Sequence, residues 1–147
     1  MKTLAYNKRA TFDYQILESY EAGIQLVGNE VKSIKANRAS LKGAYVTVLK
    51  NELILINAHV PHYQNQPTTS FDPDRSRKLL LNRREINTLI GKKTASGLTI
   101  IPIRLYLKSG KIKVEIALAK GKKAHDKRHS IRDREESRNI QRKLKQF

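Results

Sequence analysis

Alternation of apolar and polar residues, the pattern of a strand with one buried face, is the clearest signal in this sequence. Every even position from 112 to 118 is apolar, and every odd position from 101 to 107 is apolar as well. Ser109-Gly110 separates the two runs and predicts a hairpin turn between two strands. Pro102 has no backbone N–H to donate, so we expect it at a sheet edge or at a β-bulge.

Three more segments are typical of strands. Residues 45–49 and 53–57 flank Asn51-Glu52 and predict a second hairpin. The segment from 12 to 26 is either a long opening hairpin or a bent strand, and we expect a turn near Glu21-Ala22-Gly23. All three segments lie in the first half of the chain, so the predicted strands are spread along its length.

Two helices interrupt the predicted strands. The first spans Gly28 to Asn37 and buries Val31 and Ile34. The second begins at the capping-box-like segment Asn82-Arg83-Arg84-Glu85 and ends at Gly91, a residue type that favours helix ends. Its apolar face carries Ile86, Leu89 and Ile90.

Six or so short antiparallel strands with two small helices predict a mainly β fold with small flanking helices. A closed antiparallel barrel of the oligonucleotide-binding (OB) type removes exposed strand edges and is our preferred architecture. A β-sandwich fits the periodicity equally well. Residues 1–119 hold nearly all core-forming side chains and predict one domain, with a loop from 61 to 74 that is rich in Pro, Thr, Ser and Asp.

Charge narrows the class of partner. The 147 residues include 30 Lys and Arg, 13 Asp and Glu and no Cys, for a formal net charge of +17. Such an excess destabilises a compact chain by self-repulsion, so an anionic partner is expected. Nucleic acid is favoured over a membrane surface, because a membrane-binding helix would need bulky apolar residues opposite its charge. The sequence has no apolar run of membrane-spanning or signal-peptide length, which predicts a cytoplasmic protein.

Residues 120–147 form a basic C-terminal segment. They contain eleven Lys and Arg, four Asp and Glu and only five apolar residues, too few to offset the entropy of ordering. We therefore predict a tail that is disordered in isolation. If the tail becomes helical on RNA, Arg134, Arg138 and Arg142 form one cationic row that phosphates would neutralise, so folding would accompany binding.

Catalytic and metal-binding patterns are not found. His59-x-x-His62 has no Cys or carboxylate partner at ligand spacing, so we expect no metal site. Gly91-Lys92-Lys93 lacks the preceding glycine of a phosphate-binding loop, and Asp72 and Asp74 flank Pro73 as turn residues. We expect no enzyme activity and no cofactor, and we expect a monomer when the protein is free.

Six segments, in this order along the chain, resemble the successive signatures of the small protein B family. They are Asn7-Lys8-Arg9-Ala10, Tyr20-Glu21-Ala22-Gly23, Gly28-Asn29-Glu30-Val31-Lys32-Ser33, Asp72 to Leu81, Ala119-Lys120-Gly121-Lys122-Lys123 and Asp126-Lys127-Arg128. The resemblance implies an OB-type barrel that binds the tRNA-like domain of transfer-messenger RNA, near its elbow and shortened D-arm. It also implies delivery of that RNA to stalled ribosomes, with the tail helical in the empty decoding site and messenger RNA channel.

Carried over residue by residue, the resemblance implies two sets of RNA-binding positions. The face for transfer-messenger RNA comprises Asn7, Lys8, Arg9, Glu21, Arg75, Arg77, Lys78, Leu80, Lys120, Lys122 and Lys123. The set for the ribosomal decoding site comprises His125, Asp126, Lys127 and Arg128 of the tail, and the helical spacing of the tail itself adds the cationic row of Arg134, Arg138 and Arg142. An imidazole at position 125 can stack on an RNA base. The loop from 62 to 70 and the residues beyond Ser137 follow no pattern that assigns them a role.

Several alternatives stay open at this stage. Glu21 could be a turn residue paired with a nearby Lys, and Leu80 could be an ordinary core residue. The whole chain could be a ribosomal protein or a nonspecific RNA binder, or a small ribonuclease. Single-strand binders need exposed aromatic residues. This chain has three Phe, six Tyr and no Trp, several of them on predicted core faces, which favours structured RNA.

Overall fold

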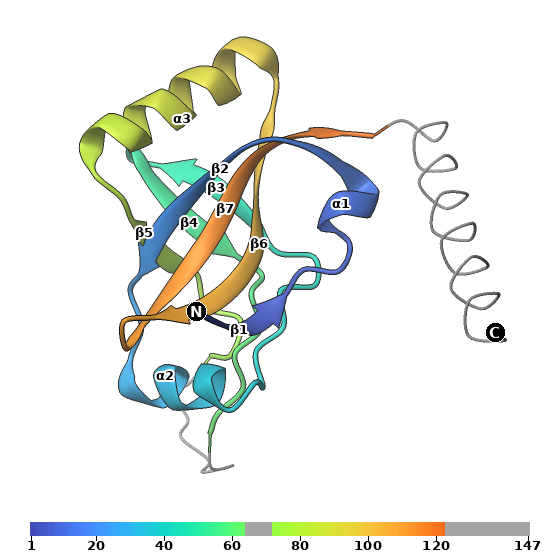
Figure 1. Ribbon diagram of the computed structural model, residues 1–147. Helices are drawn as coiled ribbons and strands as arrows, with labels where there is room; N and C mark the ends of the chain where they lie inside the picture. Colours follow the sequence, from blue (N-terminus) through green and yellow to red (C-terminus); the bar gives the residue numbers. More distant parts are fainter. Residues whose placement is uncertain (64–71, 123–147) are drawn as a thin grey trace, which may run out of the picture.

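The computed structural model describes residues 1–63 and 72–122, which form seven strands and three helices (Figure 1). The strands are β1 (Lys2–Tyr6), β2 (Tyr14–Ile24), β3 (Tyr45–Leu49), β4 (Glu52–Ile56), β5 (Arg77–Leu80), β6 (Thr99–Lys108) and β7 (Lys111–Gly121). The helices are α1 (Ala10–Asp13), α2 (Gly28–Lys35) and α3 (Arg83–Ser96). Residues 123–147, which include most of the predicted tail, lie outside the described residues, as does the loop segment 64–71.

The strands close into a ring in which every pair is antiparallel. Their order is β1-β6-β3-β4-β5-β2-β7, and a further pairing of β6 with β7 joins the two sides. β6 therefore has three neighbours, because its later half pairs with β1 and Ile100 pairs with Val46 of β3. This ring agrees with the predicted OB-type barrel. In Figure 1, α3 and α2 lie at opposite ends of the ring and α1 lies beside the end of β7.

Both predicted hairpins form. The β6–β7 turn uses Ser109 and Gly110, whose φ angles of 51° and 77° are the left-handed values that a tight hairpin turn requires. The β3–β4 turn uses Lys50 and Asn51, one residue earlier than expected, because Glu52 already pairs with Leu49. A register shift follows Pro102 in the β6–β7 pairing, so its predicted position at a β-bulge is confirmed.

The prediction of a turn near residues 21–23 is wrong. β2 is one continuous strand from Tyr14 to Ile24, and residues 21, 22 and 23 all pair with β7. Ala22 is buried in the barrel core, which a turn residue at the surface would not be. Of the two alternatives the bent strand is therefore correct, with its register shift between Ile16 and Glu18. The four-residue helix α1 before it was not predicted.

The helices agree with the prediction at their starts better than at their ends. The Asn82 side chain accepts a hydrogen bond from the Glu85 backbone N–H at 2.8 Å, as a helix cap does. α3 continues past the exposed Gly91 and ends at Gly97, whose φ of 60° is the left-handed conformation of a helix C-terminus. The stop predicted at Gly91 is therefore wrong. α2 buries Ile34 completely.

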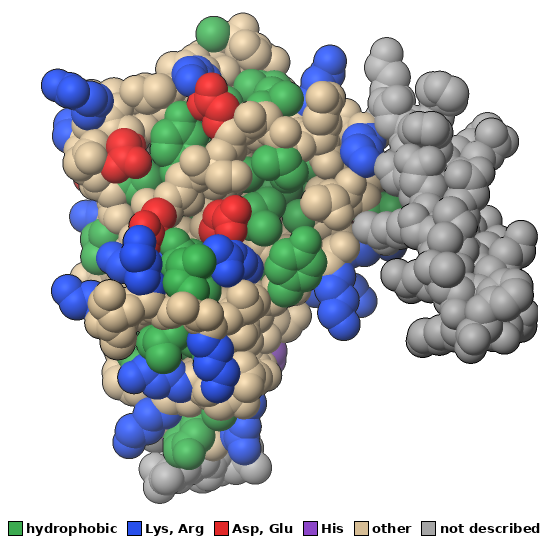
Figure 2. Space-filling view, viewed as in Figure 1, with side chains coloured by type: hydrophobic (Ala, Val, Ile, Leu, Met, Phe, Trp, Pro, Cys, Tyr) green, Lys and Arg blue, Asp and Glu red, His purple; other side chains and the backbone are tan. Residues whose placement is uncertain are grey.

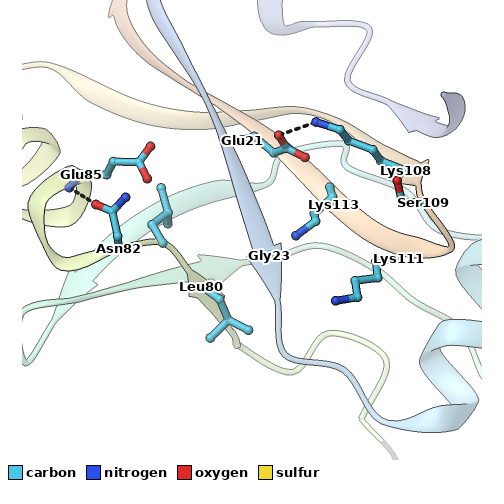
Figure 3. Close-up of a pocket in the computed structure, with 10 residues that line it drawn as sticks. Glu21, Gly23, Leu80, Asn82, Glu85, Lys108, Ser109, Lys111 and Lys113 are labelled. Carbon is cyan, nitrogen blue, oxygen red and sulfur yellow. Dashed lines mark hydrogen bonds and ion pairs between the residues drawn. The ribbon is translucent and has the colours of Figure 1, made fainter.

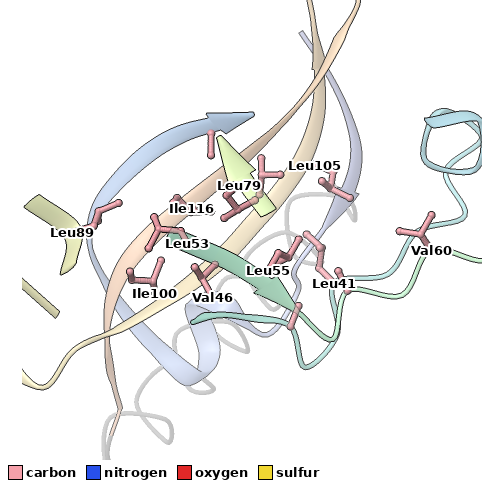
Figure 4. Packing of buried hydrophobic residues seen from close by; sticks show 14 of the residues in the cluster. Leu41, Val46, Leu53, Leu55, Val60, Leu79, Leu89, Ile100, Leu105 and Ile116 are labelled. Carbon is pink, nitrogen blue, oxygen red and sulfur yellow. The ribbon is translucent and has the colours of Figure 1, made fainter. Parts of the chain in front are cut away.

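Aliphatic side chains fill the barrel (Figure 4). Those with at most 1% of their surface exposed include Leu53, Leu55, Leu79, Ile100, Leu105 and Ile116. A second, smaller apolar cluster lies under α1 and comprises Ala10, Ile101, Ile103, Ala117 and Ala119. The two clusters bury both faces of the first half of β6, which explains why residues 100–103 are all buried. The second cluster fixes α1 to the outside of the barrel.

Candidate nucleic-acid interface

A recess of about 590 Å³ opens where β2 passes from β7 to β5 (Figure 3). Gly23 pairs with Lys113 of β7 on one side and with Leu80 of β5 on the other. The Ser109-Gly110 turn brings Lys108 and Lys111 to the rim of the same recess. We call Glu21, Gly23, Leu80, Lys108, Lys111 and Lys113 the strand-crossing site. Its three lysines were not predicted, although their position beside the hairpin turn is visible in the sequence.

Leu80 belongs to this surface and not to the core. Half of its surface is exposed, so the core-packing alternative for Leu80 is wrong. Gly23 makes the position possible, because a Cβ atom there would lie 3.2 Å from the Leu80 Cβ. A larger residue at position 23 would push Leu80 out of place. The close approach of β2 and β5 therefore presents an apolar side chain in the middle of a basic surface.

Glu21 is held as a carboxylate in the strand-crossing site. Its Oε2 accepts a hydrogen bond from Lys108 Nζ at 3.1 Å, and this contact lowers the pKa of Glu21. Glu21 thus pairs with a lysine, as one alternative expected, but from within a strand and not from a turn.

Tyr106 lies beneath Glu21 and is almost completely buried. Burial raises the pKa of Tyr106 to about 12, and a hydrogen bond with Glu21 acts in the same direction. The Arg104 guanidinium lies 4.5 Å from the centre of the Tyr106 ring and donates to Glu115 at 2.6 Å. The Glu21 carboxylate, fixed among these cations, can accept hydrogen bonds from base amino groups. Such contacts add selectivity to the attraction between lysines and phosphates.

Two basic segments that are distant in the sequence meet around α1. Lys122 Nζ donates to the Thr11 carbonyl at 2.8 Å, across 111 positions of the chain. The Lys122 backbone N–H also donates to the Asp13 carbonyl at 2.9 Å. Arg9 lies near the same turn. We call Lys8, Arg9, Lys120 and Lys122 the α1 basic cluster. β7 runs to Gly121, so Lys120, Gly121 and Lys122 belong to the body and not to the tail as predicted.

Arg77, predicted to contact RNA, is instead completely buried. Its Nε donates to Glu30 Oε2 at 2.7 Å, and its terminal nitrogens donate to the carbonyls of Ala58 at 2.8 Å and Pro73 at 3.0 Å. Arg75, with about a third of its side chain exposed, pairs with the other oxygen of Glu30. Burial raises the pKa of Glu30, but hydrogen bonds from Arg75 and Arg77 oppose it and the net shift is downward.

Asn7 is also buried and holds the fold together. It is 7% exposed, and its side-chain amide donates to the Pro102 carbonyl at 2.9 Å. Its backbone N–H donates to the Ile103 carbonyl at 2.8 Å. These contacts join the start of α1 to the bulge in β6. Lys78, by contrast, is exposed on β5 and lies 4.0 Å from Glu52.

The remaining predicted site residues lie outside the described residues. They are Lys123, His125, Asp126, Lys127, Arg128, Arg134, Arg138 and Arg142. Within residues 1–63 and 72–122, no group of three or more His, Cys, Asp or Glu side chains could hold a metal ion. None of the helices described in these two ranges combines the length and apolar character needed to span a membrane.

On the face that Figure 2 shows, Lys and Arg side chains surround areas of apolar surface. Blue side chains border this face and gather over its lower part, and green apolar surface lies among them. Red side chains lie mostly higher on the same face. Lysines and arginines bind phosphates, and a fixed carboxylate with an exposed leucine adds contacts that only a shaped partner satisfies. The surface is thus suited to a folded polyanion.

Comparison with known proteins finds one family along nearly the whole chain. The model of the family described as "SmpB protein" matches residues 4–146. The chain is 45% identical to the "SsrA-binding protein" of Thermosynechococcus vestitus over 99% of its length and 97% of that protein. It is 48% identical to the protein of the same description from Trichormus variabilis, over 99% of this chain and 95% of the other.

Solved structures are similar as well. A chain from the structure described as "tmRNA-SmpB: a journey to the center of the bacterial ribosome" is 43% identical, with a TM-score of 0.67. The match covers 81% of this chain and 84% of the other. Sequence and fold thus point to the same set of relatives.

Proposed function

This chain belongs to the SmpB protein family, and on that premise we propose that it is an adaptor that binds transfer-messenger RNA and brings it to the ribosome for trans-translation. The observation that carries this function is the full-length match to SsrA-binding proteins, together with a similar chain from a structure of transfer-messenger RNA and SmpB at the bacterial ribosome. Both partners work in the cytoplasm, which we propose as the location of this protein.

We propose that the body binds the tRNA-like domain through the strand-crossing site and the α1 basic cluster. Lys8, Arg9, Lys120 and Lys122 neutralise backbone phosphates, and Lys78 of β5 and Arg75, just before that strand, extend the basic surface. Glu21 and Leu80 contribute contacts that depend on the shape of the RNA. Because Asn7 and Arg77 are buried, we assign them to positioning this surface and not to direct contact.

We propose that the tail performs the second half of the task. His125, Asp126, Lys127 and Arg128 would occupy the decoding site, and Arg134, Arg138 and Arg142 would line the empty messenger RNA channel. The composition supports this assignment, because a segment with so many cations and so few apolar residues is suited to a path between phosphates. The protein then needs no enzyme activity and no cofactor of its own, and we propose that it is a monomer before it binds RNA.

Competition binding tests the proposed function. The purified protein is incubated with the labelled tRNA-like domain and with random single-stranded RNA of equal length. We expect clear preference for the tRNA-like domain at physiological salt. Equal affinity for both would favour a nonspecific RNA binder. Retention on vacant ribosomes after a high-salt wash would favour a constitutive ribosomal protein, and cleavage of the RNA with magnesium would favour a ribonuclease.

A further inference from the structure

A second recess continues from the strand-crossing site toward α2. It has a volume of about 420 Å³, within the usual range of about 300–1,000 Å³ for small-ligand sites. Gly23, Leu80, Lys111 and Lys113 line both recesses, so the two form one groove that passes over Gly23.

The walls of the second recess are aliphatic. Ile24 and Leu26 from the end of β2 and the segment after it, Val31 from α2 and Ile112 from β7 are all partly buried and face the recess together with Leu80. Such side chains offer flat contact area without hydrogen-bonding groups. They fit the face of an unstacked base, which is largely apolar, better than they fit a phosphate or a sugar.

The rim of the second recess is basic. Lys35, Lys111 and Lys113 line it, and no acidic side chain of residues 1–63 and 72–122 does, whereas Glu21 and Glu85 line the first recess. In Figure 3 the Lys111 and Lys113 side chains extend toward the crossing at Gly23, and Leu80 points toward the same space. Charge therefore changes along the groove, from mixed beside Glu21 to purely positive beside Val31.

We propose that this second recess is a nucleobase subsite. One unpaired base of the RNA bound at the strand-crossing site turns past Leu80 and lies against Val31 and Ile112. Lys35 and Lys111 contact the phosphates on either side of that base. This inference rests on the proposed function, because it takes the same RNA as its ligand, and it adds which part of the nucleotide is bound and by which residues.

Two matched pairs of variants test the subsite. Val31→Ser removes apolar contact inside the recess, and Val27→Ser makes the same change at a half-exposed residue that lines neither recess. Serine at position 27 also suits the start of α2. Lys35→Gln removes a rim charge, and Lys32→Gln removes an exposed charge of the same helix that lines neither recess. Thermal unfolding of each variant shows whether its fold is retained.

The measurement is chemical probing of the bases of the tRNA-like domain, free and bound, with salt-dependent affinity. We expect the wild-type protein to protect an unpaired base that Val31→Ser leaves reactive. The RNA affinity of Val31→Ser should fall about fourfold for each valine methyl group that no longer contacts the base. Val31→Ser should leave the salt dependence unchanged. Lys35→Gln should lower its slope by roughly 0.7–0.9. The control variants should behave as wild type.

Three results would overturn the subsite. One is equal base reactivity with Val31→Ser and Val27→Ser. Another is unchanged RNA affinity in Val31→Ser with weakened binding to ribosomes, which would assign the recess to a protein or to ribosomal RNA. The third is that the wild-type protein shows no preference for the tRNA-like domain over random RNA, which would refute the proposed function itself. In the first two cases the proposed function stands and only the subsite is refuted.

Discussion

The buried pair of Glu30 and Arg77 should be essential for stability and should not act as an RNA contact. Both side chains are completely buried, and the Arg77 Nε lies 2.7 Å from Glu30 Oε2. Arg77→Met keeps an apolar stem but leaves Glu30, among the described residues, with Arg75 as its one remaining cationic side-chain partner. Loss of one member of a buried pair costs about 3–5 kcal/mol. For a chain of this size we therefore expect Tm to fall by roughly 10–20 °C.

The stabilising effect of this pair should disappear in acid. The folded protein holds the pKa of Glu30 below its ordinary value of 4.5, so folding favours the ionised carboxylate. The contribution is fully present above the ordinary pKa and is lost as pH falls through the lower folded pKa. The stability difference between wild type and Arg77→Met should thus be largest near neutral pH and should shrink below about pH 4.

Thermal unfolding followed by circular dichroism, with urea titration at two pH values, measures these effects. The double variant Glu30→Leu with Arg77→Met removes both charges and should recover part of the loss, because no unpaired buried carboxylate remains. Recovery should be incomplete, since the carbonyls of Ala58 and Pro73 each lose the hydrogen bond from Arg77, although the Pro73 carbonyl keeps the one from the Val60 N–H. A single variant as stable as wild type would refute this account. So would a folded Arg77→Met protein whose RNA binding has a reduced salt slope, since that would place Arg77 on a phosphate.

Three further outcomes are expected. Glu21→Gln should reduce the preference for the tRNA-like domain over random RNA and leave the salt slope unchanged, as competition filter binding would show; a changed slope would contradict its role in selectivity. Lys8→Gln should lower the salt slope by roughly 0.7–0.9, whereas Lys50→Gln, an exposed turn residue of the β3–β4 hairpin, should not. Truncation after Lys123 should leave RNA affinity nearly intact and abolish tagging in a stalled-ribosome translation assay; loss of RNA binding would refute the division between body and tail.

Period-two alternation predicts the strands well where one face is buried and the other is wet. It gives β6, β7 and their turn correctly because apolar residues alternate along both strands, although both faces are buried at residues 100–103 and 116–119 and the simple one-sided environment holds only nearer the hairpin turn. It does not give the continuity of β2, since Glu21-Ala22-Gly23 has the composition of a turn while all three residues pair with β7. The glycine there serves the close crossing with β5, which is a tertiary contact that local sequence does not reveal.

The sequence predicted only part of the candidate site, because the position of some of its residues depends on partners that are distant in the sequence. Arg77 stands in a basic segment that looks like exposed surface, and only its pairing with Glu30 across 47 positions explains why it is buried. One signal was present: Arg77 and Leu79 are two residues apart, so they lie on the same face of a strand, and Leu79 is an obvious core residue. The same alternation places Leu80 outward. The meeting of the Lys8 and Lys122 segments, however, depends on the closed ring and cannot be found from either segment alone.

The closed ring also sets the order in which the chain can fold. β2 lies near the start of the chain, and its principal partner, β7, begins at Lys111. During synthesis β2 must therefore wait with an open edge until residues 111–121 have left the exit tunnel. Pairings between such distant segments form slowly, and unpaired edges invite wrong association in the meantime. A nascent chain that ends before β7 therefore cannot form this barrel.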